Sequence, residues 1–300
     1  MSAPPSSSAA KFVAYAGYPL ILATALASSW MLVSTGAPDW ESVAGVVVAS
    51  ALVVWALERA LPFARRWTPT GRSLLLDLLH SVVSANGVAM LVRATVLVAV
   101  VALGDYLRTT TGVALWPTSW PIAAQVAFAM VVGDFGAYWA HRAMHLTDIG
   151  WRIHAVHHTP KKLHFLASGR THPFNTMFVF SCETGIVLLL GVPHDVLVLM
   201  SVFKAVNGLL QHSNVDFRPG VLSHVMTTCD VHRWHHSEVM EESNTNFGNN
   251  TMLWDKLFGT FFLPNRRPRT EVGIAGSNIR ENYFAHLATP FTYSEDPEQT

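Results

Sequence analysis

Long apolar runs dominate the pattern of hydrophobic and polar positions in this chain. Residues 12–33 contain no charged residue, residues 43–61 form a second run with a charged pair near its end, and residues 121–139 form another. An α-helix needs about 20 apolar residues to cross a bilayer. Each of these runs therefore predicts a transmembrane helix.

Two further apolar runs are interrupted. Residues 74–103 are apolar overall, but four polar residues break the run: Asp77, His80, Asn86 and Arg93. We interpret this run either as a hairpin or as a tilted helix that faces protein rather than lipid. Residues 174–210 are broken by the sequence GVPHD, whose glycine and proline favour a turn between two shorter helices. The chain is therefore predicted to be all-α, an integral membrane helical bundle.

The composition agrees with a membrane location. Charged residues make up 13% of the 300 residues, and 20 basic residues balance 20 acidic ones. Soluble domains contain about 25% charged residues, and nucleic-acid-binding proteins carry a basic stripe. We expect a membrane-embedded protein with no nucleic-acid partner. The two cysteines, Cys182 and Cys229, are too few for a disulfide framework or a cysteine-based zinc site.

Loop charges predict the orientation in the membrane. The loop STGAPDWES after the first run is acidic, whereas the loop PFARRWTPTGR after the second holds Arg65, Arg66 and Arg72. Positively charged loops stay on the cytoplasmic side. If residues 74–103 cross once, the run at 121–139 ends at the cytoplasmic surface, which is that of the inner membrane if the protein is bacterial. A hairpin would reverse this orientation.

Histidine is the unusual residue, with 15 copies of which most lie between positions 141 and 236. His141 and His145, in HRAMH, are four residues apart, so on a helix they share a face at about 5–6 Å. Two imidazoles at this spacing can hold one metal ion. Asp134 lies on the same stripe, and we expect it to accept an imidazole N–H or to orient a neighbouring helix.

The pattern HAVHH at 154–158 returns as HRWHH at 232–236. The first and last histidines of each motif are four residues apart, and the adjacent pair diverges by about 100° on a helix, so one motif can serve two ions. Histidines also cap helices or sit hydrogen-bonded in a core, but three motifs that flank an apolar segment favour a metal site. Imidazole suits Fe, Zn, Cu and Ni, and spacing does not choose among them. The motifs supply eight candidate ligands: His141, His145, His154, His157, His158, His232, His235 and His236.

Other polar residues are possible additions to this site. His212, in QHSN, is a candidate ninth ligand, and Asn207 is either a neutral ligand or a helix-packing amide. His172 either lies near the site or anchors a loop. His80, with Asp77, lies in an apolar run, where ionisable residues are usually paired or functional. Ordinary structural roles are expected for four others: His164, His194, His224 and His286.

The three histidine boxes, in the order HRAMH, HAVHH and HRWHH, resemble those of the fatty acid hydroxylase and sterol desaturase superfamily of integral-membrane di-iron enzymes. The segments GDFGAYWAHR, QHSN and NFGNNTMLWDKLFGTF extend the resemblance over about residues 124–263. It implies a stem of membrane helices with a cytosolic His-rich metal-binding cap. It also implies that the eight box histidines and His212 bind two Fe ions.

The resemblance divides the chain into four parts. Residues 1–11 are expected to be a disordered tail, residues 12–120 the N-terminal transmembrane helices, residues 121–263 the catalytic domain with its three histidine boxes, and residues 264–300 a C-terminal tail. Four aromatic residues are candidates for lining a substrate groove: Phe135, Tyr138, Trp139 and Trp151.

The implied chemistry is O2-dependent oxidation of an unactivated C–H bond in a lipid that arrives from the bilayer. The lipid is an acyl, sterol, ether-lipid or amino-lipid substrate, and hydroxylation and desaturation both remain open. Some members carry a fused cytochrome b5-like domain, which we do not find in this sequence. We therefore expect a separate cytochrome b5-, ferredoxin- or reductase-like electron donor.

Two other classes of protein were weighed. A membrane zinc hydrolase would usually carry H-E-x-x-H, which this sequence lacks. A non-enzymatic metal carrier would place its ligands within the spans, and a haem protein would use histidine pairs on facing helices. The Glu-x-x-His motif of soluble di-iron bundles is also missing. These comparisons favour the oxygenase.

Overall fold

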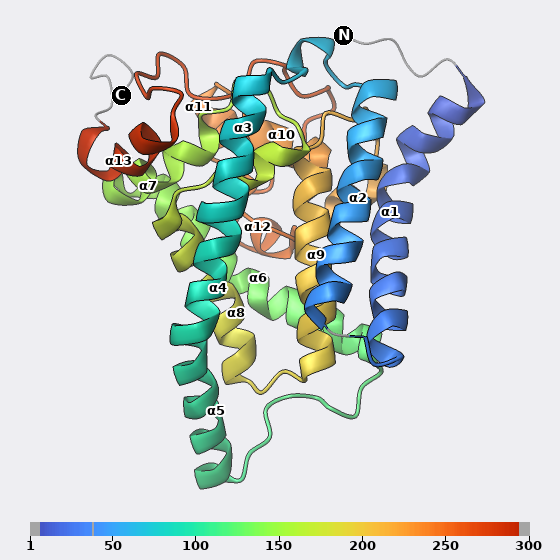
Figure 1. Ribbon diagram of the computed structural model, residues 1–300, viewed down its shortest axis with the longest axis vertical. Coiled ribbons are helices and arrows are strands. Elements are labelled where there is room, and N and C mark those ends of the chain that lie inside the picture. The colour runs from blue at the N-terminus through green and yellow to red at the C-terminus, as the bar shows by residue number, and fades with distance from the viewer. Residues whose placement is uncertain (1–6, 38, 294–300) are drawn as a thin grey trace.

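The computed structural model describes residues 7–37 and 39–293, and within them it contains helices, turns and loops but no strand (Figure 1). Four helical segments are long and apolar enough to cross a membrane: α1 (Ser8–Ser34), α2 (Asp39–Ala60), the segment Gly71–Thr111, and α6 (Ile122–Leu146). This confirms the predicted all-α class with membrane-spanning helices.

The third apolar run is one continuous helix and not a hairpin. Gly71–Thr111 extends for 41 residues and comprises α3 (Gly71–Leu79), α4 (Val88–Val92) and α5 (Val98–Thr111). Wider π-helical turns, His80–Gly87 and Arg93–Leu97, join these pieces. The segment contains no proline, so no turn interrupts it.

The same helix faces outward over most of its surface. Only 17% of its most apolar stretch is buried, against 44% for α6. The expectation that this run faces protein rather than lipid is therefore wrong. Asp77 and His80 are buried by contacts with other segments, whereas Asn86 and Arg93 line an apolar pocket, as the following sections describe.

The interrupted run at 174–210 forms two helices, as predicted. α8 (Pro173–Leu189) and α9 (His194–His212) are joined by a turn in which Gly191 adopts φ = 86°, a conformation that favours glycine. α9 packs beside α1 and α2, and α8 packs against α6 and α5. The pair therefore closes the centre of the bundle.

Short helices form a cap at one end of the bundle (Figure 1). They are α7 (Asp148–His158), α10 (Cys229–His235), α11 (Met240–Ser243) and α13 (Tyr283–Thr292), with short turns at Arg65–Trp67, Phe165–Gly169 and Gly220–His224. A further short helix, α12 (Leu253–Leu257), lies lower in the bundle beside α6. Buried Glu58, at the end of α2, ties this cap to the stem. Its carboxylate accepts from the backbone N–H groups of Phe165 and Asn214, both at 2.8 Å.

Helices occupy part of each segment that the sequence predicts to be a tail. α1 begins at Ser8, capped by the Ser7 side chain, so residues 8–11 belong to a helix and not to the expected tail. The expected tail at 264–300 includes α13, which packs against α7. Residues 1–6 and 294–300 lie outside the described part of the chain.

Glycine allows α6 and α8 to approach closely. A Cβ atom at Gly136 would overlap the backbone carbonyl of Cys182, which cannot move aside as a flexible side chain could. By contrast, a Cβ atom at Gly185, on α8, would meet nothing within 4 Å. The contact at Gly136 lies five residues before His141 and thus fixes how α6 enters the cap.

We expect Gly136→Ala to lower the thermal unfolding midpoint of the detergent-solubilised protein, because overpacking costs about 1–3 kcal/mol. Gly185→Ala is the matched control, and its midpoint should stay the same or rise, since alanine favours a helix by up to about 1 kcal/mol over glycine. Equal midpoints for the two variants would show that the close crossing does not stabilise the fold.

Candidate metal centre

Nine histidines meet where the stem joins the cap, and they form two groups. In each group the nearest ring nitrogens all lie within 4.8 Å of one another. The first group is His141, His145, His154, His158 and His235, and the second is His157, His212, His232 and His236. The structure thus brings together every histidine that the sequence singled out as a ligand, including His212.

Four helices supply the two groups, and two of them, α7 and α10, contribute to both. α6 supplies two histidines, α7 three, α9 one, and α10 with the residue after it three. The adjacent residues His157 and His158 enter different groups, and so do His235 and His236. This is the divergence that the doubled motif predicts for a pair of ions.

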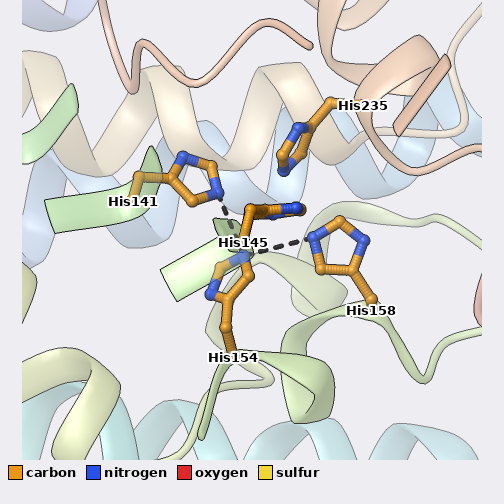
Figure 2. A group of neighbouring side chains, drawn as sticks. All are labelled: His141, His145, His154, His158 and His235. Carbon is orange, nitrogen blue, oxygen red and sulfur yellow. Dashed lines mark hydrogen bonds between the residues drawn. The ribbon is translucent and has the colours of Figure 1, made fainter. Parts of the chain in front are cut away.

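Figure 2 shows the five rings of the first group directed at a common centre. Nε2 of His154 lies 3.0 Å from Nε2 of His141 and 3.1 Å from Nε2 of His158. Nε2 of His145 and of His235 are buried without a hydrogen-bond partner among the described residues. A buried ring nitrogen without a partner is costly, and a metal ion bound to these atoms would remove that cost.

The second group is arranged in the same way. Nε2 of His212 lies 3.2 Å from Nε2 of His157 and 2.9 Å from Nε2 of His232. Nε2 of His236 lies 3.0 Å from that of His232. Four Nε2 atoms therefore share one small space.

Backbone carbonyls decide which ring nitrogen carries the proton. Nδ1 of His141 donates to the Phe247 carbonyl at 2.8 Å, Nδ1 of His157 to the Arg170 carbonyl at 3.0 Å, and Nδ1 of His212 to the Gly208 carbonyl at 2.9 Å. Nδ1 of His235 likewise donates to the Thr245 carbonyl at 2.8 Å. A carbonyl only accepts, so each of these neutral rings presents a bare Nε2 lone pair to the centre.

Burial keeps the rings neutral. It lowers the pKa of His157 to about 4 and holds the pKa values of the other cap histidines well below the usual range: His154, His158, His232, His235 and His236. Desolvation of the charged imidazolium is the main cause in each case; the charge of Arg170 adds to it for His157, and neighbouring histidines add to it for the other five. Neutral imidazole is the form that binds a metal ion.

The lone pairs of His157 and His212 face each other at 3.2 Å with no proton between them. Two such lone pairs repel in a buried site, and a cation placed between them removes the repulsion. Nitrogen-rich, carboxylate-free groups of this size fit a transition metal better than Mg²⁺ or Ca²⁺. The nine residues therefore fit two metal ions, one for each group.

Asp134 does not accept from an imidazole, contrary to one of the two expectations. Its buried carboxylate accepts from the backbone and side chain of Asn250 and of Thr251 at 2.8–3.3 Å. It thereby holds the loop that contains Phe247, whose carbonyl accepts from His141. Sequence reasoning missed Asp255, which accepts from the backbone N–H groups of Phe247 and Gly248 at 2.8 Å.

The remaining candidates lie outside both groups. Asn207 packs as a buried amide that accepts from Tyr18 at 2.7 Å. His172 caps α8 through Phe174 N–H. His80 faces His286 on α13, with 2.9 Å between their ring nitrogens. His286, for which the sequence predicts an ordinary role, is therefore the partner of His80.

The other buried polar residues of the long helix are also paired. Asp77 accepts from Arg170 and lies 2.9 Å from His164, and the carbonyl of that arginine accepts from His157. Asp77 thus supports the second histidine group through Arg170, a contact that the spacing of residues along the sequence does not reveal.

A cavity of about 250 Å³ opens beside the histidines. His141, His154, His157, His212 and His232 line it, together with residues of α8 and α9 such as Phe180, Glu183 and Lys204. None of the four predicted aromatics lines it. Phe135 packs on Trp254, Tyr138 and Trp139 pack on Phe258, and Trp151 packs on the rings of His145 and His158.

Comparison with known proteins places these residues in a family. A model of the family described as fatty acid hydroxylase matches residues 126–260. An ornithine lipid hydroxylase of Rhizobium tropici is 36% identical over 255 residues, which cover 82% of this chain and 75% of that protein. No solved structure matches this chain significantly.

Two more distant relatives match in part. Human alkylglycerol monooxygenase is 29% identical over 136 residues, 45% of this chain and 30% of that protein. A very-long-chain aldehyde decarbonylase of Oryza sativa subsp. indica is 28% identical over 156 residues, 51% of this chain and 57% of that protein. The extent of the first match and the family model together show that this chain belongs to the fatty acid hydroxylase superfamily.

Proposed function

We propose that this protein is a membrane di-iron oxygenase that hydroxylates a C–H bond of a lipid, using O2 and electrons from a separate donor. The observation that carries the proposal is the convergence of imidazole Nε2 atoms in two adjacent groups that share no carboxylate. The proposed ligands are the nine histidines of these two groups. The proposed catalytic domain is residues 121–263, which enclose both.

The relatives favour hydroxylation of a lipid. The relative that matches most of this chain is named a hydroxylase of ornithine lipid, and another is named a monooxygenase of alkylglycerol. The net reaction joins the lipid, one O2, two electrons and two protons, and it yields the hydroxylated lipid and one water. Two iron ions held by the histidines would supply the activation of O2.

The protein's own contribution is to hold the ligand rings in place and to provide the cavity beside them. Carbonyls fix the rings of four ligands before any metal arrives, so binding requires little reorganisation. Residues of α8 and α9, two helices of the bundle, line the cavity beside the histidines. In this proposal the lipid enters the cavity from the membrane, between these helices. The ion pair between Lys204 and Glu183, at 2.6 Å, stands at this side of the cavity.

We expect His157→Ala and His235→Ala each to abolish hydroxylated lipid and to lower the iron content of the purified protein. Each variant removes one ligand from one group and leaves the other group's residues in place. His224→Ala, which removes an exposed histidine outside the groups, is the control and should behave as wild type. Lipid mass spectrometry detects the added oxygen atom, and metal analysis counts the iron.

Several results would contradict this proposal. Full activity in both variants would exclude the ligand assignment, and loss of two hydrogen atoms in place of a gained oxygen would make the enzyme a desaturase. A single zinc ion with hydrolytic activity would favour a hydrolase. An optical Soret band would favour a haem protein.

The cap with the histidines is proposed to face the cytoplasm. If the long helix and α6 each cross the membrane once, the chain returns to the side of the loop that holds Arg65, Arg66 and Arg72. Positively charged loops stay in the cytoplasm, so the cap would lie there too. Two of these arginines contact the C-terminal segment, Arg66 through an ion pair with Glu271 at 2.7 Å.

Cysteine labelling tests this orientation. In right-side-out membrane vesicles, a membrane-impermeant maleimide should label Thr111→Cys, at the far end of the long helix, and should spare Arg66→Cys until the vesicles are opened. Both positions are exposed in the structure. The opposite labelling pattern would place the histidines outside.

A further inference from the structure

An apolar pocket of about 720 Å³ lies between α2, the long helix, α8 and α9. It adjoins the histidine cavity, because on three helices one residue lines the histidine cavity and the next residue along the chain lines the apolar pocket. Ala85 and Asn86, Glu183 and Thr184, and Lys204 and Ala205 are divided in this way, with the first of each pair at the histidine cavity and the second at the apolar pocket. The two spaces are therefore neighbours that share the same three helices.

Arg93 is the arginine in the lining of this pocket, and its side chain is exposed at the edge of the pocket and not buried inside it. It lies near the middle of the 41-residue helix Gly71–Thr111, so its side chain is far from either helix end. Its neighbours in the lining are mainly aliphatic, with Leu97, Leu188 and Leu197 among them. We find no ion pair for Arg93 among the described residues, although its guanidinium lies 5.3 Å from the centre of the Phe180 ring. A charged side chain within a membrane segment is usually functional or paired.

A second cation stands on the same aromatic ring. Lys204 lies 5.2 Å from the centre of Phe180, whose ring lines the histidine cavity. This lysine already has a carboxylate partner, Glu183, which also accepts from Asn250 at 3.0 Å. The junction of the two spaces thus holds two cations and one carboxylate, and the cation without an ion-pair partner is Arg93.

We propose that Arg93 binds the anionic group of the lipid substrate, a carboxylate or a phosphate, while an acyl chain fills the apolar pocket. Guanidinium donates paired hydrogen bonds to either kind of anion, and the low-dielectric pocket strengthens them. Arg93 is then a positioning residue, because it fixes which carbon of the lipid reaches the histidine cavity. The inference rests on the proposed function in taking the occupant to be a lipid.

The test compares three ligands that share the same hydrocarbon chain and differ in the head group: oleate, oleyl phosphate and oleyl alcohol. Dissociation constants are measured for the full-length protein in non-ionic detergent, together with iron content and the thermal unfolding midpoint. The variants are Arg93→Gln, Arg93→Lys and Ala44→Phe, the last of which fills the pocket. Arg59→Gln is the matched control, since Arg59 also stacks on an aromatic ring, Trp55, but lies outside the pocket.

We expect wild type to bind at least one of the anionic ligands about tenfold or more tightly than the alcohol, because a hydrogen bond to a charged group is the stronger kind. The tighter anion identifies the head group. Arg93→Gln should lose the preference and keep its affinity for the alcohol, Arg93→Lys should keep part of the preference, and Arg59→Gln should match wild type. Ala44→Phe should weaken all three ligands.

Equal binding of the anionic ligands by wild type and Arg93→Gln would overturn the proposal. An equal loss of all three ligands in Arg93→Gln with a lower unfolding midpoint would also overturn it, since the arginine would then be structural. Binding needs no turnover, so the result is separate from the proposed activity. A preference for the anion in a protein that carries iron but oxidises no lipid would refute the proposed function and leave this site standing.

Discussion

The structure depends on one electrostatic constraint, the gathering of nine imidazoles whose ring nitrogens meet in two small groups. Four of the rings are locked in this orientation by carbonyls that accept from Nδ1. Without a cation the facing lone pairs repel, so the rest of the fold must hold the rings against that repulsion. A site assembled in this way is ready for metal and needs no negative charge beside an apolar substrate.

The scaffold that resists the repulsion consists of buried carboxylates and close helix contacts. Asp134 and Asp255 together hold the loop that presents the Phe247 carbonyl, and Glu58 ties cap loops to α2. The glycine contact at Gly136 brings α6 against α8, which sets the depth at which α6 presents its two histidines. Each of these devices lies away from the rings and acts on them through one or two hydrogen bonds or one helix contact.

What could be predicted from the sequence is what is encoded locally. Apolar runs have the length of a span, and histidines three and four residues apart share a helix face, so the helices and the doubled motif could both be read directly. Contacts across long separations could not be read. Asp77 meets Arg170, and His80 meets His286, more than ninety and two hundred residues away along the chain. Without those partners the polar residues of the long helix predict a hairpin or a protein-facing helix, and the segment that forms α13 has the composition of a tail.

The long helix shows why those polar residues are compatible with a single outward-facing span. Its two π-helical turns begin at His80 and at Arg93, and each such turn changes the angular phase of every residue that follows. A regular helix would fix the direction of Arg93 relative to His80, whereas the wider turn that begins at His80 changes it, so that His80 reaches the cap and Arg93 lines the apolar pocket. The helix thus serves the cap at one level and the pocket at another, while the rest of its surface remains apolar toward the membrane. Length, apolarity and local widening together make one helix the link between the cap and the apolar pocket.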